Sequence, residues 1–377
     1  MDPVFRLIHS ADLHLGRRFG NLPEAARGRL IEARHQALVA LAQAARTTGA
    51  TDILLAGDTF DSETPSDPVW RQALRAMGAA PDLRWWLLPG NHDSLAAETL
   101  WTNLQRHAPP NLTLITSPGA VEIAPRVTLL AAPLERRRNA RDLTDWMPGC
   151  ATPEGHMRLG LAHGAVQDFA ESGGTDDGII APDRAQTAGL DYLALGDWHG
   201  QMRLGPRTAY SGTPEADGFR HTGRGACLAV SLSPGALPVV NRIETGQFHW
   251  AEAVLPLVPD LDPVQALARL LPDDFAQHRD HLLKIRATGR ATLAGQAALL
   301  ERAQTLGPDF WVFSLELAGL DTQIDTADLE HLDHGGALRL AAEALARQAA
   351  DPALAEAERR VAAGALNRLY SYLRDPS

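Results

Sequence analysis

The sequence predicts an α/β protein whose first part is built on parallel strands. Over residues 5–107, short apolar runs alternate with segments of helical periodicity. Several of these apolar runs end in a glycine beside carboxylate, amide or imidazole residues, as strands do where open α/β sheets carry their chemistry. A strand, a helix and a strand in succession favour parallel pairing of the two strands.

Length and composition are those of a globular protein with two or three domains. The chain has 377 residues, 45% hydrophobic and 21% charged. Its net charge of −11 argues against a generally basic nucleic-acid coat, although bound dications and a local arginine patch can supply positive charge. Cys150 and Cys227 form neither a disulfide framework nor a metal-binding spacing. Without a signal-peptide pattern or a bilayer-length apolar run, we expect a soluble, cytoplasmic protein.

The first predicted strand, residues 5–10, leads into Asp12 and His14. The two side chains point to the same side of an extended segment, because side chains alternate along a strand. A carboxylate and an imidazole on one side form half of a cation site. A polar strand end has the same composition, so this pair needs partners from elsewhere in the chain.

The next helix and strand supply such a partner. A helical pattern over residues 24–46 is followed by Gly49, a plausible stop. The strand predicted at residues 53–56 then delivers Asp58 and Asp61. Parallel pairing would bring Asp58 to the same sheet edge as the first pair.

The third strand, residues 85–88, leads into the stretch Gly90-Asn91-His92-Asp93. Its amide offers an oxygen to a hard cation, and its imidazole can give a proton near neutral pH. By turn statistics alone, the tetrapeptide is equally well explained as a polar turn.

Short strands follow, predicted at residues 112–115, 121–123 and 127–132 and separated by proline and glycine as in an antiparallel meander. The arginine run 136–138, together with Arg141, comes next. A charge run is more often a solvated face than a phosphate-binding patch, and we favour the solvated face here.

Two later apolar runs also end in ligand-type residues. One delivers His163, and the other delivers Gly196-Asp197-Trp198-His199. Five successive strand ends therefore carry such residues next to glycine. Independent turns would rarely give that series, so the combination predicts a metal centre.

The order of these motifs, DxH…GDxxD…GNHD…H…GxxH, resembles the calcineurin-like metallophosphoesterases over residues 5–212. The segments HSADLHLG, LLAGDTFD, PGNHD and AYSGTPEADGF resemble in particular the SbcD/YhaO-like bacterial DNA repair exonucleases. This resemblance implies a four-layer αββα sandwich that carries two divalent metal ions. Mn2+ is the expected ion, with Mg2+, Fe and Zn2+ as alternatives.

The resemblance also assigns roles to the motif residues. Its metal ligands are Asp12, His14 and His199 for the first ion, Asn91 and His163 for the second, and Asp58 as the bridge between them. It makes His92 the catalytic imidazole and Asp61 the group that orients it. Asp93 is expected to support the loop as a hydrogen-bond acceptor.

One position departs from the family pattern. The family usually has GHxH where this chain has Gly196-Asp197-Trp198-His199. A carboxylate oxygen suits Mn2+, Mg2+ or Fe, so we expect Asp197 to bind the second ion. It also adds negative charge to the site, and the alternative is that Asp197 points away and the second ion binds weakly.

Three domains are predicted. They are a metallophosphoesterase (nuclease) domain at residues 1–250, a capping domain at 251–334 and a helical segment at 335–377. The middle segment shows a small α/β pattern, and the resemblance makes it the domain that selects DNA shape. The last segment carries an apolar stripe, formed by Leu354, Val361, Ala365, Leu369 and Tyr372. Such a stripe more often packs against its own domain, and the alternative is that it binds a partner.

These features predict a dinuclear-metal phosphodiester hydrolase, in the first place a DNA exonuclease or endonuclease subunit acting in DNA repair. The expected partners are DNA and an SbcC-like ATPase, with no membrane. The family also suggests a homodimer through helices around residues 68–77 and 98–107. The alternatives are a metallophosphoesterase of small nucleotides or phosphomonoesters, and a largely structural subunit with a weakened second metal site.

Overall fold

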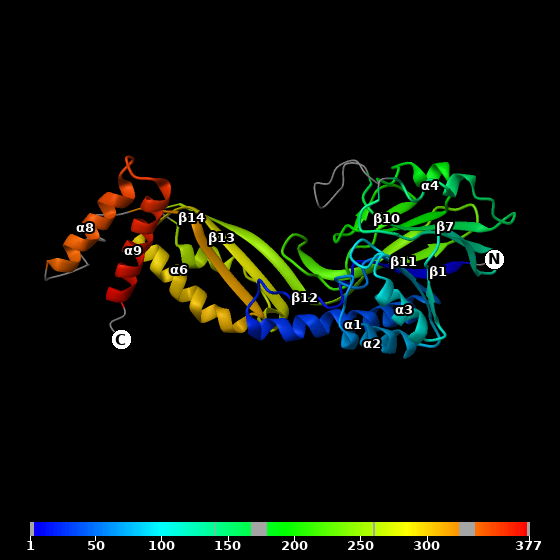
Figure 1. Ribbon diagram of the computed structural model, residues 1–377. Helices are drawn as coiled ribbons and strands as arrows, with labels where there is room; N and C mark the ends of the chain where they lie inside the picture. The colour runs from blue at the N-terminus through cyan, green and yellow to red at the C-terminus, as the bar shows by residue number, and fades with distance from the viewer. Residues whose placement is uncertain (1–3, 140, 167–178, 259–260, 324–335, 375–377) are drawn as a thin grey trace. The chain divides into compact units, whose positions relative to one another are not determined.

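The computed structural model describes residues 4–139, 141–166, 179–258, 261–323 and 336–374. The chain divides into two compact units, Met1–Trp250 and Ala251–Ser377 (Figure 1). Strand β12 (Val239–Leu257) begins in the first unit and ends in the second. The predicted boundary between residues 334 and 335 lies outside the described residues.

The first unit contains two sheets. The strands of the first sheet in this unit are, in spatial order, β12, β11 (Gly223–Leu232), β1 (Phe5–Ser10), β2 (Asp52–Ala56), β3 (Arg84–Leu88) and β4 (Leu112–Leu114). The strands of the second sheet are β5 (Gly119–Ala124), β6 (Val127–Ala132), β7 (Met157–His163), β8 (Tyr192–Gly196), β10 (Thr208–Tyr210) and β9 (Met202–Arg203). Strands β1 to β4 pair in parallel, as do β6, β7, β8 and β10. Parallel pairing collects their carboxyl ends at one edge of each sheet.

Alternating side chains create the layers of this unit. Along β1, Leu7 faces the core between the sheets and Ile8 faces the core under the helices. Along β3, Trp86 faces the core between the sheets and Trp85 faces the core under the helices, so both indoles are core residues. The helices on the outer face of the first sheet are α1 (Glu24–Thr48), α2 (Asp67–Gly78) and α3 (Glu98–His107).

The outer face of the second sheet is covered by α4 (Arg184–Thr187) and the 3-10 turn η1 (Met147–Gly149) (Figure 1). The result is a mixed α/β fold with two multi-stranded sheets between helices. The predicted fold class is thus confirmed.

One part of the predicted topology is wrong. Leu112–Leu114 is not a member of an antiparallel meander but pairs in parallel with β3 in the first sheet. Of the three strands predicted for this meander, β5 and β6 do form an antiparallel pair. The reason is that α3 connects β3 to β4, and a helical crossover returns the chain in the parallel direction.

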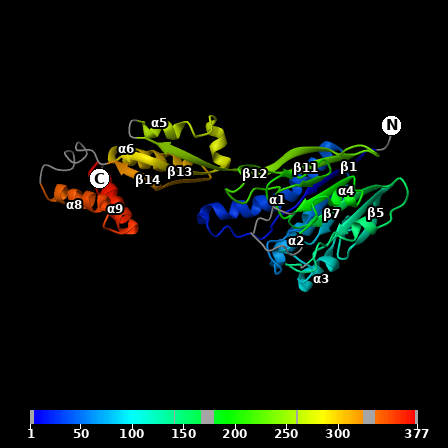
Figure 2. The ribbon, with the colours of Figure 1, turned by 90° about the horizontal axis from the view of Figure 1, so that it is seen from above.

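The second unit repeats a strand–helix–strand arrangement. Its strands β13 (His281–Thr292) and β14 (Val312–Gln323) are parallel, and α6 (Leu293–Leu306) packs against both (Figure 2). The remaining elements are α5 (Pro263–Ala268), η2 (Phe275–Asp280), η3 (Gly307–Asp309), α8 (Ala337–Ala350) and α9 (Glu356–Arg374). Asp262 caps α5, because its carboxylate accepts the N–H groups of Val264 and Gln265.

The last two helices pack on α6 through a small apolar cluster. Leu293, Ala342 and Leu366 are its buried members, and Leu369 of the predicted stripe packs against them. Val361 of the same stripe is 72% exposed, whereas the side chain of Tyr372 lies outside the described residues. Within the described ranges, no helix has the length and apolar character of a membrane span.

A histidine is buried inside strand β1 of the first unit. His9 Nδ1 lies 2.9 Å from the Tyr192 hydroxyl, and Nε2 lies 3.1 Å from the Leu195 carbonyl. A carbonyl only accepts, so Nε2 carries the hydrogen and Nδ1 accepts from the tyrosine. Burial lowers the pKa of His9 to about 3, so the ring stays neutral in the folded protein.

This histidine predicts an acid-dependent loss of stability. Between its ordinary pKa of 6.5 and about 3, the unfolded chain binds one more proton than the folded chain at this site, so the free energy of unfolding falls as pH falls. Between pH 6.5 and 4.5 the wild type should lose roughly 2–3 kcal/mol more than His9→Gln. Urea unfolding at both pH values measures the difference, and parallel pH curves for the two proteins would contradict it.

Candidate metal centre

The residues predicted as ligands come together from loops of both sheets. Asp12 and His14 follow β1, Asp58 follows β2, and Asn91 follows β3. In the second sheet, His163 ends β7, while Asp197 and His199 follow β8. The distances between these side chains define two groups of potential ligands, and Asp58 contacts a histidine of each group.

The first group is formed by Asp12, His14 and His199. Their potential ligand atoms all lie within 4.8 Å of one another. The Nε2 atoms of the two histidines are 3.1 Å apart. Burial lowers the pKa of His14 to about 4, so its ring is neutral near neutral pH. Two imidazole nitrogens and a carboxylate directed at one point are a donor set that suits a divalent transition-metal ion.

The second group is formed around His163. Its Nε2 lies 3.2 Å from Asn91 Oδ1, 3.6 Å from Asp58 Oδ1 and 3.8 Å from Asp197 Oδ1. Its Nδ1 donates to the Ala56 carbonyl at 2.8 Å, so Nε2 is the ring nitrogen that could bind a cation in exchange for its proton. Amide, carboxylate and imidazole donors again fit a divalent ion.

Asp58 lies between the two groups. Its Oδ2 is 3.5 Å from His14 Nε2, and its Oδ1 is 3.6 Å from His163 Nε2. Gly90 passes directly beside it, since a Cβ on Gly90 would lie 2.1 Å from Asp58 Oδ1. The glycine of the GNHD motif is therefore required by the close approach of two loops.

Asp197 points toward the second group. Besides the carboxylate contact with His163, its backbone N–H donates to Asp12 Oδ1 at 3.1 Å. Its φ of 109° lies in a region that favours glycine. This position suits a ligand of the second ion, and the role itself stays a prediction.

Strained backbone is concentrated in this centre. Asp12, His14 and Asp58 have φ values of 56°, 42° and 53°, and such conformations cost of order 1–3 kcal/mol each. The buried guanidinium of Arg34 stabilises the first of these turns by donating to the carbonyls of Asp12 and Leu13 at 3.0 and 2.7 Å.

Asp61 contacts His92 through its backbone and His14 through its side chain. His92 Nδ1 lies 3.0 Å from the backbone carbonyl of Asp61, so it donates there and leaves Nε2 available for proton transfer. The Asp61 carboxylate lies 3.2 Å from His14 Nδ1 instead. Asp93 accepts the N–H groups of Gly90 and Phe60 at 2.7 and 3.0 Å, which ties the loops after β2 and β3 together.

Sequence reasoning missed a carboxylate that supports the first group. Asp217 Oδ2 lies 3.0 Å from His199 Nδ1 and 2.8 Å from Arg17 Nη1. Burial alone would raise the pKa of Asp217, but the hydrogen bond from His199 and the charges of Arg34 and Arg17 hold it well below its usual range. The one signal was its place in the segment AYSGTPEADGF.

Electrostatics also indicates a cation. Burial, with the nearby charges of Asp58 and Asp197, raises the pKa of Asp12 to about 7. Burial alone would lower the pKa of His163, but Asp58, Asp12 and Asp197 raise it to about 9. The protein thus gathers more buried negative charge than its own groups neutralise, and divalent ions would remove that imbalance.

Comparisons with known proteins bear on this centre. The model of the family described as calcineurin-like phosphoesterase matches residues 5–199. A curated relative from Bacillus subtilis (strain 168), the uncharacterized metallophosphoesterase YhaO, is 26% identical over 294 residues, which cover 72% of this chain and 68% of the relative.

Solved structures show a distant likeness. The protein TT1561 of Thermus thermophilus is 12% identical with a TM-score of 0.38, over 61% of this chain and 99% of that one. A dimetal phosphatase from Danio rerio is 12% identical with a TM-score of 0.39, over 63% and 99%.

Replacing Asp197 tests its predicted role. Asp197→Gly removes the carboxylate and relieves the φ of 109°, so metal content should fall from two ions per chain toward one. The metal-free variant should unfold at a higher temperature than the metal-free wild type, because strain and negative charge are both lost. Elemental analysis after dialysis and thermal unfolding in EDTA measure the two effects.

Asp197→His is the matched variant, since it restores a nitrogen donor. It should keep two ions and shift the preference toward Zn2+. Two full equivalents of metal in Asp197→Gly would show that this carboxylate is not a required ligand.

Proposed function

Because the chain belongs to the calcineurin-like phosphoesterase family, we propose that it is a two-metal phosphodiesterase that acts on DNA. The observation that supports this reaction is the position of Asp58 between His14 of one ligand group and His163 of the other, with His92 on the adjoining loop. When bound, two divalent ions would clamp the phosphate and supply a hydroxide nucleophile. Mn2+ is our proposal for both.

The chain's own residues position and complete this chemistry. His163 is fixed by its hydrogen bond to the Ala56 carbonyl, and His199 by its hydrogen bond to the Asp217 carboxylate. The ring of His92 is fixed by the Asp61 carbonyl, so its Nε2 can deliver a proton to the leaving oxygen. An imidazole at that position also offsets the negative charge that develops as the ester bond breaks.

The choice of DNA is supported by the sequence resemblance to SbcD/YhaO-like DNA repair exonucleases. We also propose that residues 251–334 act as a capping domain that selects DNA shape. The exposed side of the last helices, which includes Val361 and Leu340, is our proposed docking surface for an SbcC-like ATPase.

A second candidate function is hydrolysis of small nucleotide diesters. The cavity beside His92 has a volume of about 260 Å³. That volume approaches the lower end of the range of small-molecule sites. A strand of DNA would have to extend beyond this cavity along the surface.

An activity assay on purified protein separates the two candidates. With Mn2+ the wild type should degrade linear DNA, and EDTA should stop it. His92→Ala should lose roughly 10²–10⁴ in rate while keeping two ions per chain, because His92 is predicted to transfer a proton and not to bind metal.

His107→Ala is the control, because this histidine ends α3 away from the centre. It should keep both activity and metal. Hydrolysis of bis(p-nitrophenyl) phosphate without any degradation of DNA would favour the second candidate. Loss of metal in His92→Ala would show that its assigned role is wrong.

A further inference from the structure

An arginine lines the cavity beside the metal centre. The residues around this 260 Å³ cavity are Asp61, Ser62, Glu63, Asn91, His92 and Arg137. Five of them belong to the loops after β2 and β3, whereas Arg137 comes from the loop after β6. Among these six, it is the one with a permanent positive charge.

Two hydrogen bonds shape the loop that carries Arg137: one joins it to the loop after β3, and the other lies within it. The Leu95 N–H, next to the GNHD stretch, donates to the Leu134 carbonyl at 3.0 Å. The Asn139 amide donates to the Arg136 carbonyl at 2.9 Å. In the described part of the chain, no ion pair engages the exposed guanidinium of Arg137. It is therefore held near the centre and is available to an anionic ligand.

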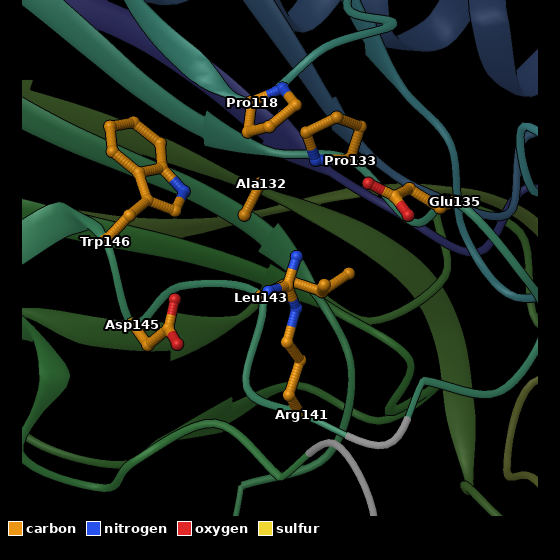
Figure 3. A pocket seen from close by; sticks show the side chains of 8 residues that line it. All are labelled: Pro118, Ala132, Pro133, Glu135, Arg141, Leu143, Asp145 and Trp146. Carbon is orange, nitrogen blue, oxygen red and sulfur yellow. The ribbon is translucent and has the colours of Figure 1, made fainter.

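The other arginines of this run do not share that position. Arg136 and Arg138 are exposed and do not line the cavity beside His92. Arg141 lines a different cavity of about 300 Å³, together with Glu135, Asp145 and Trp146 (Figure 3). That cavity contains none of the predicted ligands nor His92, so Arg137 is the arginine of this run that lies beside the centre.

Charge and position indicate which phosphate it would bind. In the proposed reaction, bound ions would hold the scissile phosphate, and His92 would protonate the leaving oxygen. Since His92 and Arg137 line the same cavity, that cavity lies on the leaving-group side. The Asp61 carboxylate contacts His14, and Glu63 accepts from Ser94 at 3.3 Å. These two carboxylates repel anions from the rest of the wall.

We propose that Arg137 binds a second phosphate, one carried by the leaving group. The site would thereby favour a phosphodiester whose leaving group carries a further phosphate, as in a nucleotide strand, over a phosphodiester without one. This inference rests on the proposed phosphodiesterase function and names the substrate feature that the same site recognises. A guanidinium is suited to this task because it can bind a phosphate with two parallel hydrogen bonds.

Dinucleotides test this selection without long DNA. The wild type should hydrolyse one of pTpT and TpTp with a higher kcat/KM than TpT, since one of them places the extra phosphate on the leaving group. Arg137→Gln should lower kcat/KM for that dinucleotide about 10- to 100-fold, mainly through KM, and remove its advantage over TpT. Arg136→Gln is the matched control and should keep the advantage.

A binding measurement gives a second readout that needs no turnover. In a His92→Ala background, the affinity for a fluorescent single-stranded oligonucleotide is measured against salt concentration. Arg137→Gln should reduce the slope of log affinity against log salt by about 0.7, the value for one lost phosphate contact. Arg136→Gln should leave that slope unchanged.

The outcomes separate this inference from the proposed function. If the dinucleotide advantage depends on Arg137 but linear DNA is not degraded, the DNA assignment fails and the role of Arg137 stands. If DNA is degraded and Arg137→Gln behaves like Arg136→Gln in both measurements, the inference is overturned and the nuclease function stands.

Discussion

The carboxylate of Asp58 is the constraint around which the centre is built. It is 2% exposed and lies between His14 and His163, which come from different sheets. It also accepts the backbone N–H of His92 at 2.8 Å. Burial alone would raise the pKa of Asp58, but His163, His14 and His92 lower it, so the group stays ionised. The contacts of this one carboxylate therefore fix the loops after β1 and β3 and the end of β7 relative to one another.

A network behind the ligands keeps that arrangement in place. Arg34 donates to the Asp12 and Glu215 carbonyls at 3.0 Å each, which joins the turn after β1 to the segment before Asp217. The Glu215 carboxylate accepts the N–H groups of Gln247 and Phe248 at 2.6 and 3.1 Å. The strained backbone conformations of the candidate ligands can persist because several independent contacts hold each of them in place.

Much of the fold and of the candidate site could be predicted from short sequence patterns, because each buried strand is an apolar run and the candidate ligands directly follow these runs. An apolar run that stops at glycine and a carboxylate, as before Asp58, specifies a buried strand and the loop that follows it. The pairing of Leu112–Leu114 was not predictable in this way, since the strand pattern does not name its partner. The segment AYSGTPEADGF contains Asp217, but its sequence does not show that this carboxylate contacts His199, which lies 18 residues earlier. Arg137 was hidden for the same reason, as a run of arginines does not reveal which one faces a cavity.

The central claim is that one carboxylate joins two metal sites. Anomalous diffraction at the manganese edge, from crystals grown with Mn2+, tests it most directly. We predict two peaks about 3.5–4 Å apart, with Asp58 between them and His92 bound to neither. A single peak, or two ions that do not share Asp58, would contradict this account.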